Sequence, residues 1–187
     1  VFELTDDADI SWVYALRFDL DGEVVADSDY IAIVSMANKS TSPDVVYNPD
    51  RDEYAVSWQF DSDGAGDAYW VYVRKVSWDG IAGSYVYYSS DGNSLLWPTL
   101  AHFDSQDEYM LSFTQVLSGG ETDVMGQRIA AGDFSLLTEQ MISIAKETGR
   151  TEQKSTVVFN DSKNEFLVGY EYDNGTDWDV RTQKVGN

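Results

Sequence analysis

One stretch of the sequence occurs three times, and this repetition restricts the fold more than any other feature. PDVVYNPDRDEYAVSW begins at residue 43, PTLAHFDSQDEYMLSF at residue 98 and STVVFNDSKNEFLVGY at residue 155. The three copies align without a gap and lie 55 and 57 residues apart. Recurrence at this interval is typical of proteins built from stacked repeats.

Each copy predicts a β-hairpin. In the first copy, the large residues Tyr54, Val56 and Trp58 alternate with smaller or polar residues. The other two copies repeat this alternation at Tyr109, Leu111, Phe113, Phe166, Val168 and Tyr170. A period of two predicts a strand with one buried face, and the polar turn before it predicts a hairpin. The middle of the other face is small (Ser57, Ser112, Gly169), so we expect a neighbouring sheet to pack closely there.

Two further strands complete each unit. A third strand is predicted about 20 residues later, at 71–76, 123–129 and 179–185, and a more variable fourth strand near 82–90 and 135–145. Residues 12–22 resemble the third strand and its turn, with a cation in a shared register at Arg17, Lys75, Arg128 and Lys184. The stretch 133–150 is the one place where a short helix competes with a strand.

Four strands in about 55 residues predict the blade of a β-propeller. One blade cannot bury its faces alone, so the copies must stack. We therefore expect one all-β repeat domain over residues 1–187, with about three and a half units at 1–42, 43–97, 98–154 and 155–187. The incomplete end units leave three arrangements open: a four-bladed ring, a partial propeller, or a propeller completed in a homodimer.

The repeat resembles a known group of sequences. The pattern P-x-V-x-Y-N, then E-Y-x-V-x-W, D-V-x-x-Q-R and a D-G turn is similar to the propeller-type repeats of bacterial extracellular and surface proteins. That resemblance implies a β-propeller or part of one, exported from the cell and used for binding. The copies depart from the pattern at Ser155, Phe103, Leu16 and Arg74, and kelch and WD signatures are absent.

Charge and composition exclude several classes of partner. The chain carries 33 acidic and 12 basic residues, a formal net charge of −21. Nucleic acids and anionic membranes need a basic surface, so neither is an expected partner. The absence of cysteine excludes disulfides and thiolate metal sites. The chain begins with Val1 and contains no apolar run long enough to span a membrane, so we expect a processed or incomplete piece.

Acidic loops make calcium the candidate cofactor. Asp61, Asp63 and Asp67 lie in DSDGAGD, between a second and a third strand. Calcium binds six to eight oxygen atoms, and a glycine-containing acidic loop can supply several of them. The loop does not match an EF-hand. The alternative is an ordinary polar turn without a metal ion.

Tryptophans beside acidic residues predict a ligand site. Trp12, Trp70 and Trp178 each stand at the entry to a third strand, and Asp123 and Asp177 lie at the same places. An aromatic ring can stack on the C–H face of a sugar while a carboxylate accepts hydrogen bonds from its hydroxyl groups. These residues are therefore candidate glycan-binding residues. The alternative is that the tryptophans only cover blade edges.

No catalytic residues are predicted. His102, the only histidine, replaces an aromatic residue on a first strand and is expected to be packed there. One histidine cannot build a multi-histidine zinc site. Carboxylate pairs at the spacing of a glycosidase will arise by chance among 33 acidic residues.

The sequence thus predicts a non-enzymatic binding module at the surface of a bacterium or outside it, recognising a glycan or surface polymer, with structural calcium as an option. Two alternatives remain open. The first is a glycoside-active enzyme whose carboxylates line the propeller axis. The second is a structural or assembly propeller with no small ligand.

Overall fold

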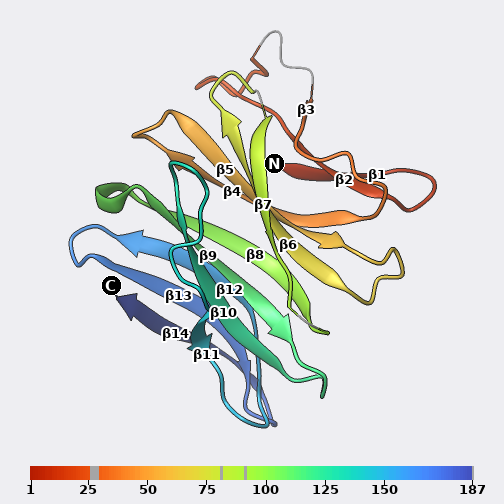
Figure 1. Ribbon diagram of the computed structural model, residues 1–187, viewed down its shortest axis with the longest axis vertical. Helices are drawn as coiled ribbons and strands as arrows, with labels where there is room; N and C mark the ends of the chain where they lie inside the picture. Colours follow the sequence, from red (N-terminus) through yellow and green to blue (C-terminus); the bar gives the residue numbers. More distant parts are fainter. Residues whose placement is uncertain (26–29, 81, 91, 187) are drawn as a thin grey trace.

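The chain is built from β-strands. The computed structural model describes residues 1–25, 30–80, 82–90 and 92–186 (Figure 1). These residues form strands and one turn of 3-10 helix, η1 (Asp104–Gln106), but no α-helix, which confirms the all-β prediction. The stretch 133–150 contains strand β11 (Ile142–Ala145), so a strand forms where a helix could have competed. No helix among the described residues is long and apolar enough to cross a membrane.

The strands fall into four units that follow the repeat. The first unit is β1 (Phe2–Thr5), β2 (Ser11–Ala15) and β3 (Ile31–Ala32). The second is β4 (Ser40–Asn48), β5 (Glu53–Asp61), β6 (Tyr69–Ser77) and β7 (Ala82–Tyr88). The third is β8 (Ser94–Phe103), β9 (Glu108–Val116), β10 (Thr122–Ala130) and β11. The fourth is β12 (Thr151–Asn160), β13 (Glu165–Asp173) and β14 (Trp178–Gly186). Within each unit, consecutive strands pair antiparallel, as in a propeller blade.

The units are arranged in an open series. A single parallel contact, Thr122 with Thr151, joins the third and fourth units into one seven-stranded sheet. The first unit (red to orange) and the fourth (blue) lie on opposite sides of the molecule in Figure 1. Among the described strands, none of the fourth unit pairs with the first. The sheets therefore do not close into a ring, and the four-bladed ring, one of the three arrangements left open by the sequence, is not confirmed.

The first strands of the second, third and fourth units begin earlier than the repeat suggests. β4, β8 and β12 begin at Ser40, Ser94 and Thr151, three or four residues before the predicted unit starts at 43, 98 and 155. Each strand contains a β-bulge near its start. A bulge inserts an extra residue, so the alternation of large and small side chains does not continue across it. This break hides the first residues of the strand from a pattern with a period of two.

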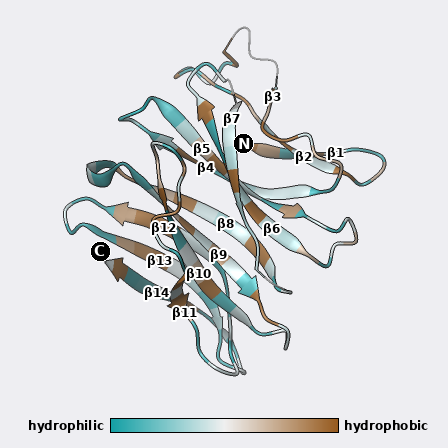
Figure 2. Ribbon diagram, in the orientation of Figure 1, coloured by the Kyte–Doolittle hydropathy of each residue, from teal (hydrophilic) through white to brown (hydrophobic). Residues whose placement is uncertain are grey.

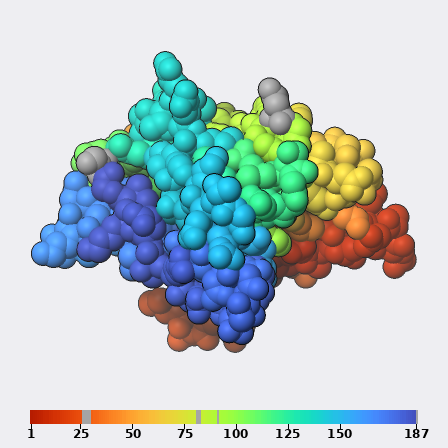
Figure 3. Space-filling model, turned by 90° about the horizontal axis from the view of Figure 1, so that it is seen from below, coloured from red at the N-terminus to blue at the C-terminus, as the bar shows by residue number. Residues whose placement is uncertain are grey.

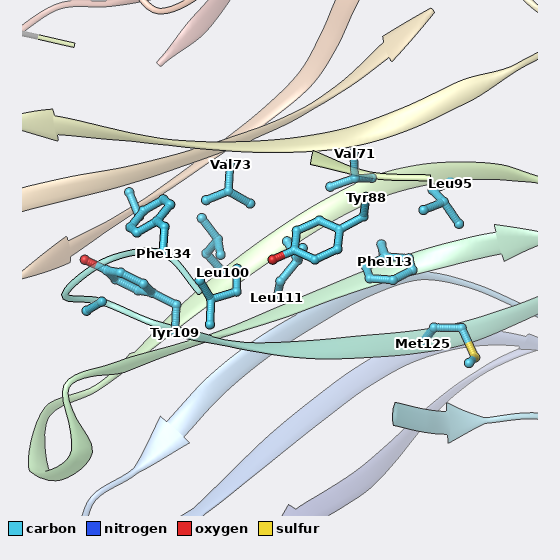
Figure 4. Close-up of a cluster of buried hydrophobic side chains, with 13 residues drawn as sticks. Val71, Val73, Tyr88, Leu95, Leu100, Tyr109, Leu111, Phe113, Met125 and Phe134 are labelled. Atoms are coloured by element: carbon cyan, nitrogen blue, oxygen red, sulfur yellow. The ribbon is translucent and has the colours of Figure 1, made fainter. Parts of the chain in front are cut away.

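Apolar side chains fill the spaces between neighbouring units. Hydrophobic positions alternate with hydrophilic ones along the strands (Figure 2). The largest cluster lies between the second and third units and includes Val71, Tyr88, Leu95, Tyr109 and Phe113 (Figure 4). Similar clusters lie on either side of it, between the third and fourth units and between the first and second. Stacking of units therefore supplies the core, as the repeat predicts.

Two of the three small residues on the other strand face are buried, whereas Gly169 is half-buried. Ser57 and Ser112 are fully inaccessible to solvent. The hydroxyl of Ser112 lies 2.6 Å from that of Ser155, on the first strand of the next unit. Close packing at these two positions agrees with the small side chains in the pattern.

Candidate functional site

The three inner strands, β4, β8 and β12, carry the same irregularity at the same place. Pairing with the second strand shifts register between Thr41 and Asp44 in β4, and at the corresponding residues of β8 and β12. The bulged residues are Ser42, Trp97 and Lys154, with φ angles of 54°, 50° and 48°. A non-glycine residue in the left-handed region is uncommon, and bulges are frequent beside active sites, where they redirect side chains. These positions therefore mark one end of the inner strands as the candidate site.

Each bulge is held by the unit before it. The backbone N–H of the bulged residue donates a hydrogen bond to a side chain on the preceding second strand or its equivalent, at 3.2, 2.9 and 3.0 Å: Ser42 to Glu3 Oε1, Trp97 to Gln59 Oε1, and Lys154 to Thr114 Oγ1. Glu171 occupies the position of Gln59 and Thr114 in the fourth unit. The bulges are thus fixed by side chains and not by glycine, and Glu171 faces the same end of the strands.

The first of two depressions at this end contains a perturbed carboxyl group. It has a volume of about 290 Å³ and is lined by Asp44, Trp97, Lys154 and neighbouring residues of β4, β8 and β12. Asp44 Oδ2 accepts a hydrogen bond from the N–H of Leu100 at 2.7 Å. Burial raises the pKa of Asp44 above its usual value, and hydrogen bonds from Leu100 and Val45 oppose that rise only in part. Asp44 can therefore hold a proton at higher pH than an exposed aspartate does.

The second depression adjoins the first through Lys154. It has a volume of about 480 Å³ and is lined by Gln153, Lys154, Glu171, Trp178, Asp179 and Val180. Lys154 Nζ lies 3.3 Å from Glu171 Oε2 and 5.7 Å from the centre of the Trp97 ring. Trp178 is 53% exposed on β14, which belongs to the blue unit at the front of Figure 3. Three carboxyl groups, a cation and two indole rings thus surround a pair of adjoining depressions.

The predicted tryptophans do not come together. Trp178 lines the second depression, beside exposed Asp177. Trp12 donates its Nε1–H to the carbonyl of Met36 at 3.1 Å, within the first unit. Trp70 lies on β6, where its ring stacks on Tyr87 at 5.2 Å. Each tryptophan therefore stays within its own unit, and its role in binding a glycan stays a prediction.

The predicted calcium loop is a tight turn. Asp61 Oδ1 accepts the N–H of Gly64, and Asp63 Oδ1 accepts the N–H of Ala65, both at 2.9 Å. The turn amides lower the pKa of Asp63, the bond from Ala65 most of all. No group of three or more acidic or histidine residues in the described part of the chain has an arrangement that could hold a metal ion. Calcium at Asp61, Asp63 and Asp67 stays a prediction.

His102 is packed, as its place on the strand predicts. Its side chain is 3% exposed, and its ring lies 5.3 Å from that of Tyr109. Nδ1 lies 2.7 Å from Asp104 Oδ1, but neither ring nitrogen has hydrogen-bonding geometry with a described residue. The ring lines a depression of about 310 Å³ at the far end of the inner strands, together with Asp161. This end is separate from the bulges.

Asp123, predicted to be a ligand residue, is buried and so cannot contact a glycan in this structure. It is 3% exposed and lies beside Glu152, which is 1% exposed, between the third and fourth units. Asp123 Oδ2 and Glu152 Oε2 have no hydrogen-bond donor among the described residues, although Lys146 Nζ lies 3.4 Å from that Asp123 oxygen. Burial, then Asp123, then Glu147 raise the pKa of Glu152, and Arg181 opposes them. The burial of Glu152 could have been inferred from the repeat, because the equivalent residue of the third unit is the apolar, buried Leu95.

Glu152→Gln is expected to stabilise the protein above pH 7. The raised pKa means that the folded state binds more protons than the unfolded chain, so stability falls as pH rises from the ordinary value of 4.5 through the folded value. Removing the charge should raise the free energy of unfolding by about 1–3 kcal/mol at pH 8, and by much less at pH 4. Urea unfolding at both pH values measures this. Exposed Glu139→Gln is the control, and an equal gain at both pH values would contradict the charge explanation.

Comparison with known proteins assigns the fold but no family. No family model matches the sequence, and no curated protein matches it. The endo-arabinase from Bacteroides thetaiotaomicron VPI-5482 has a TM-score of 0.56 at 11% identity, over 95% of this chain and 66% of that one. The GH43 endo-arabinanase from Bacillus licheniformis has a TM-score of 0.55 at 14% identity, over 78% of this chain and 51% of that one. An N-acetylgalactosamine deacetylase from F. plautii, solved in complex with blood group B trisaccharide, has a TM-score of 0.52 at 13% identity, over 98% and 63%.

These neighbours correct the functional prediction. The two arabinanase structures are five-bladed β-propellers, and this chain spans half to two thirds of the length of the three solved chains. The blades predicted from the repeat are therefore of propeller type. The prediction of a non-enzymatic binding module is contradicted, because the neighbours are enzymes that act on glycans.

Proposed function

We propose that this chain is part of a glycoside-active enzyme that cleaves a neutral polysaccharide at the bulged ends of β4, β8 and β12. The observation that carries the proposal is the placement of Asp44 and Glu171 on two depressions that share Lys154. Glycosidases commonly use two carboxyl groups, one to protonate the leaving oxygen and one to activate water or attack the sugar. Strand β4 supplies Asp44 and strand β13 supplies Glu171, both at the bulged end of the inner strands.

The two carboxyl groups have different surroundings, which suits different roles. Asp44 has a raised pKa through burial, so it is the candidate general acid. Glu171 pairs with Lys154 and accepts a hydrogen bond from Gln153 Nε2 at 3.0 Å, so it is the candidate base or nucleophile. Lys154 is a positioning residue for Glu171. The exposed indole of Trp178 offers a face on which a sugar ring can stack.

The charge of the chain selects the substrate class. A net charge of −21 repels acidic polymers such as polyuronates, so an uncharged polysaccharide is the better candidate. The names of two neighbours make arabinan the first polymer to test. Location outside the cell or on its surface belongs to the same proposal, because polysaccharides do not enter cells freely.

A substrate screen tests the function. The purified chain is incubated with arabinan, xylan, galactan and polygalacturonate, and both new reducing ends and free acetate are measured. We expect new reducing ends from at least one neutral polymer and none from polygalacturonate. Acetate release without chain cleavage would indicate deacetylation instead. No product from any polymer, with a folded protein, would overturn the proposal.

A further inference from the structure

A ladder of aromatic rings crosses the second unit from β5 to β7. The rings of Trp58, Tyr72 and Tyr87 lie on adjacent strands β5, β6 and β7. Trp58 stacks on Tyr72 with 5.4 Å between ring centres, and Tyr72 stacks on Tyr87 at the same distance. Trp70 stacks on Tyr87 at 5.2 Å with an angle of 12° between the rings. The ladder therefore runs from the core to the outer strand of the unit.

The outer end of the ladder is open to solvent. Residues of the first unit, Ile33 and Val34, join Trp58 and Tyr72 in one buried cluster, which closes the inner end. Tyr85 and Tyr87, by contrast, are 49% and 52% exposed. They lie two residues apart on β7, so their rings stand about 7 Å from each other along the strand. The result is a row of exposed aromatic rings on a rigid, stacked support.

The polar groups beside these rings suit hydroxyl groups. β7 is the last strand of its sheet, so its outward backbone N–H and C=O groups have no partner among the described strands. The nearest cation on the face, Arg74, donates hydrogen bonds to the carbonyl groups of Ile33 and Gly83. An uncharged ligand with C–H faces and many hydroxyl groups matches this surface, whereas the net charge of −21 disfavours an acidic one.

We propose that Trp70, Tyr85 and Tyr87 form a surface that binds an uncharged polysaccharide chain outside the axial depressions. Sugar rings stack on the exposed tyrosines, and their hydroxyl groups bond to the tyrosine O–H groups and the edge of β7. This surface would bind the polymer without cleaving it, so its role goes beyond the function proposed for the bulged end. It would hold a polymer on the protein independently of bond cleavage. Trp70 would serve mainly as the support on which Tyr87 stacks.

Affinity electrophoresis through gels containing neutral or acidic polysaccharide tests the surface. The Asp44→Asn variant serves as the parent, so that the polymer is not consumed. We expect retardation by at least one neutral polymer and none by polygalacturonate. Replacing both Tyr85 and Tyr87 by Ala should weaken binding about tenfold. Tyr87→Phe, which keeps the ring, should retain most of the binding.

Two controls make the outcome decisive. Tyr47→Ala removes a tyrosine that is 44% exposed but lies on β4, and it should leave retardation unchanged. Melting temperatures of all variants establish that they are folded. Unchanged binding by a folded Tyr85→Ala/Tyr87→Ala protein would overturn the proposal, as would retardation by no neutral polymer. Dimerisation through β7 that is lost in the double variant would also overturn it in favour of strand pairing.

Discussion

Asp44→Asn is expected to lower the rate of glycan hydrolysis about 100- to 10,000-fold, the usual contribution of a general acid. The substitution keeps an oxygen that can accept the N–H of Leu100, so the bulge should remain intact. It removes the proton that the raised pKa of Asp44 would deliver to the leaving oxygen. Initial rates on the polymer identified by the screen measure the loss.

The pH profile distinguishes this role from a structural one. A general acid must be protonated, so the activity of the unmodified protein should fall as pH rises through the raised pKa of Asp44. That basic limb should disappear in Asp44→Asn. Asp161→Asn is the matched control, since Asp161 lies beside the far end of the inner strands. Full activity of a folded Asp44→Asn protein would remove Asp44 from the mechanism.

Trp58→Ala should lower the free energy of unfolding by about 3–5 kcal/mol, as large-to-small changes of buried aromatic residues do. Trp58 is 1% exposed, packs between the first and second units and stacks on Tyr72. The cavity left by an alanine cannot close easily, because rigid strands from two units surround it. Urea unfolding followed by circular dichroism measures the change.

Trp178→Ala supplies the comparison for that measurement. Trp178 also belongs to the repeat but is 53% exposed, so its replacement should change stability by less than about 0.5 kcal/mol. A loss in Trp58→Ala as small as the one expected for Trp178→Ala would mean that the contact between the first and second units contributes little. In that case the core would depend mainly on the cluster between the second and third units.

The strands could be predicted because large, buried side chains alternate with smaller or polar ones along each strand. The alternation in EYAVSW marks β5 (Glu53–Asp61), and the same pattern marks β9 and β13. The third strands were equally clear. The fourth strand of each unit is harder to predict from the sequence. For example, β11 is short and pairs with β10 through a bulge. Short edge strands bury few side chains, so they leave a weak pattern.

The candidate site could not be predicted in the same way. Ser42, Trp97 and Lys154 share a left-handed backbone but no chemical property, and none is the glycine or asparagine that usually marks that conformation. Their geometry comes from side chains of the preceding unit, about 40 residues away in sequence, which a local pattern does not contain. Glu171 could have been noticed only by aligning it with Gln59 and Thr114.

The way the bulges are held has a consequence for how such a protein can evolve. The backbone geometry of Ser42, Trp97 and Lys154 depends on an acceptor from the unit before, and glutamate, glutamine and threonine all serve. These hydrogen bonds use the backbone N–H and not the side chain of the bulged residue, so they place no restriction on which side chain stands there. A hydroxyl, an indole and an ammonium group already occupy equivalent positions. Duplication of a unit followed by substitution at these three positions could change which functional groups line the bulged ends of β4, β8 and β12, while the strands stay the same. Exchanging whole blades between such proteins would be a direct way to build new axial surfaces.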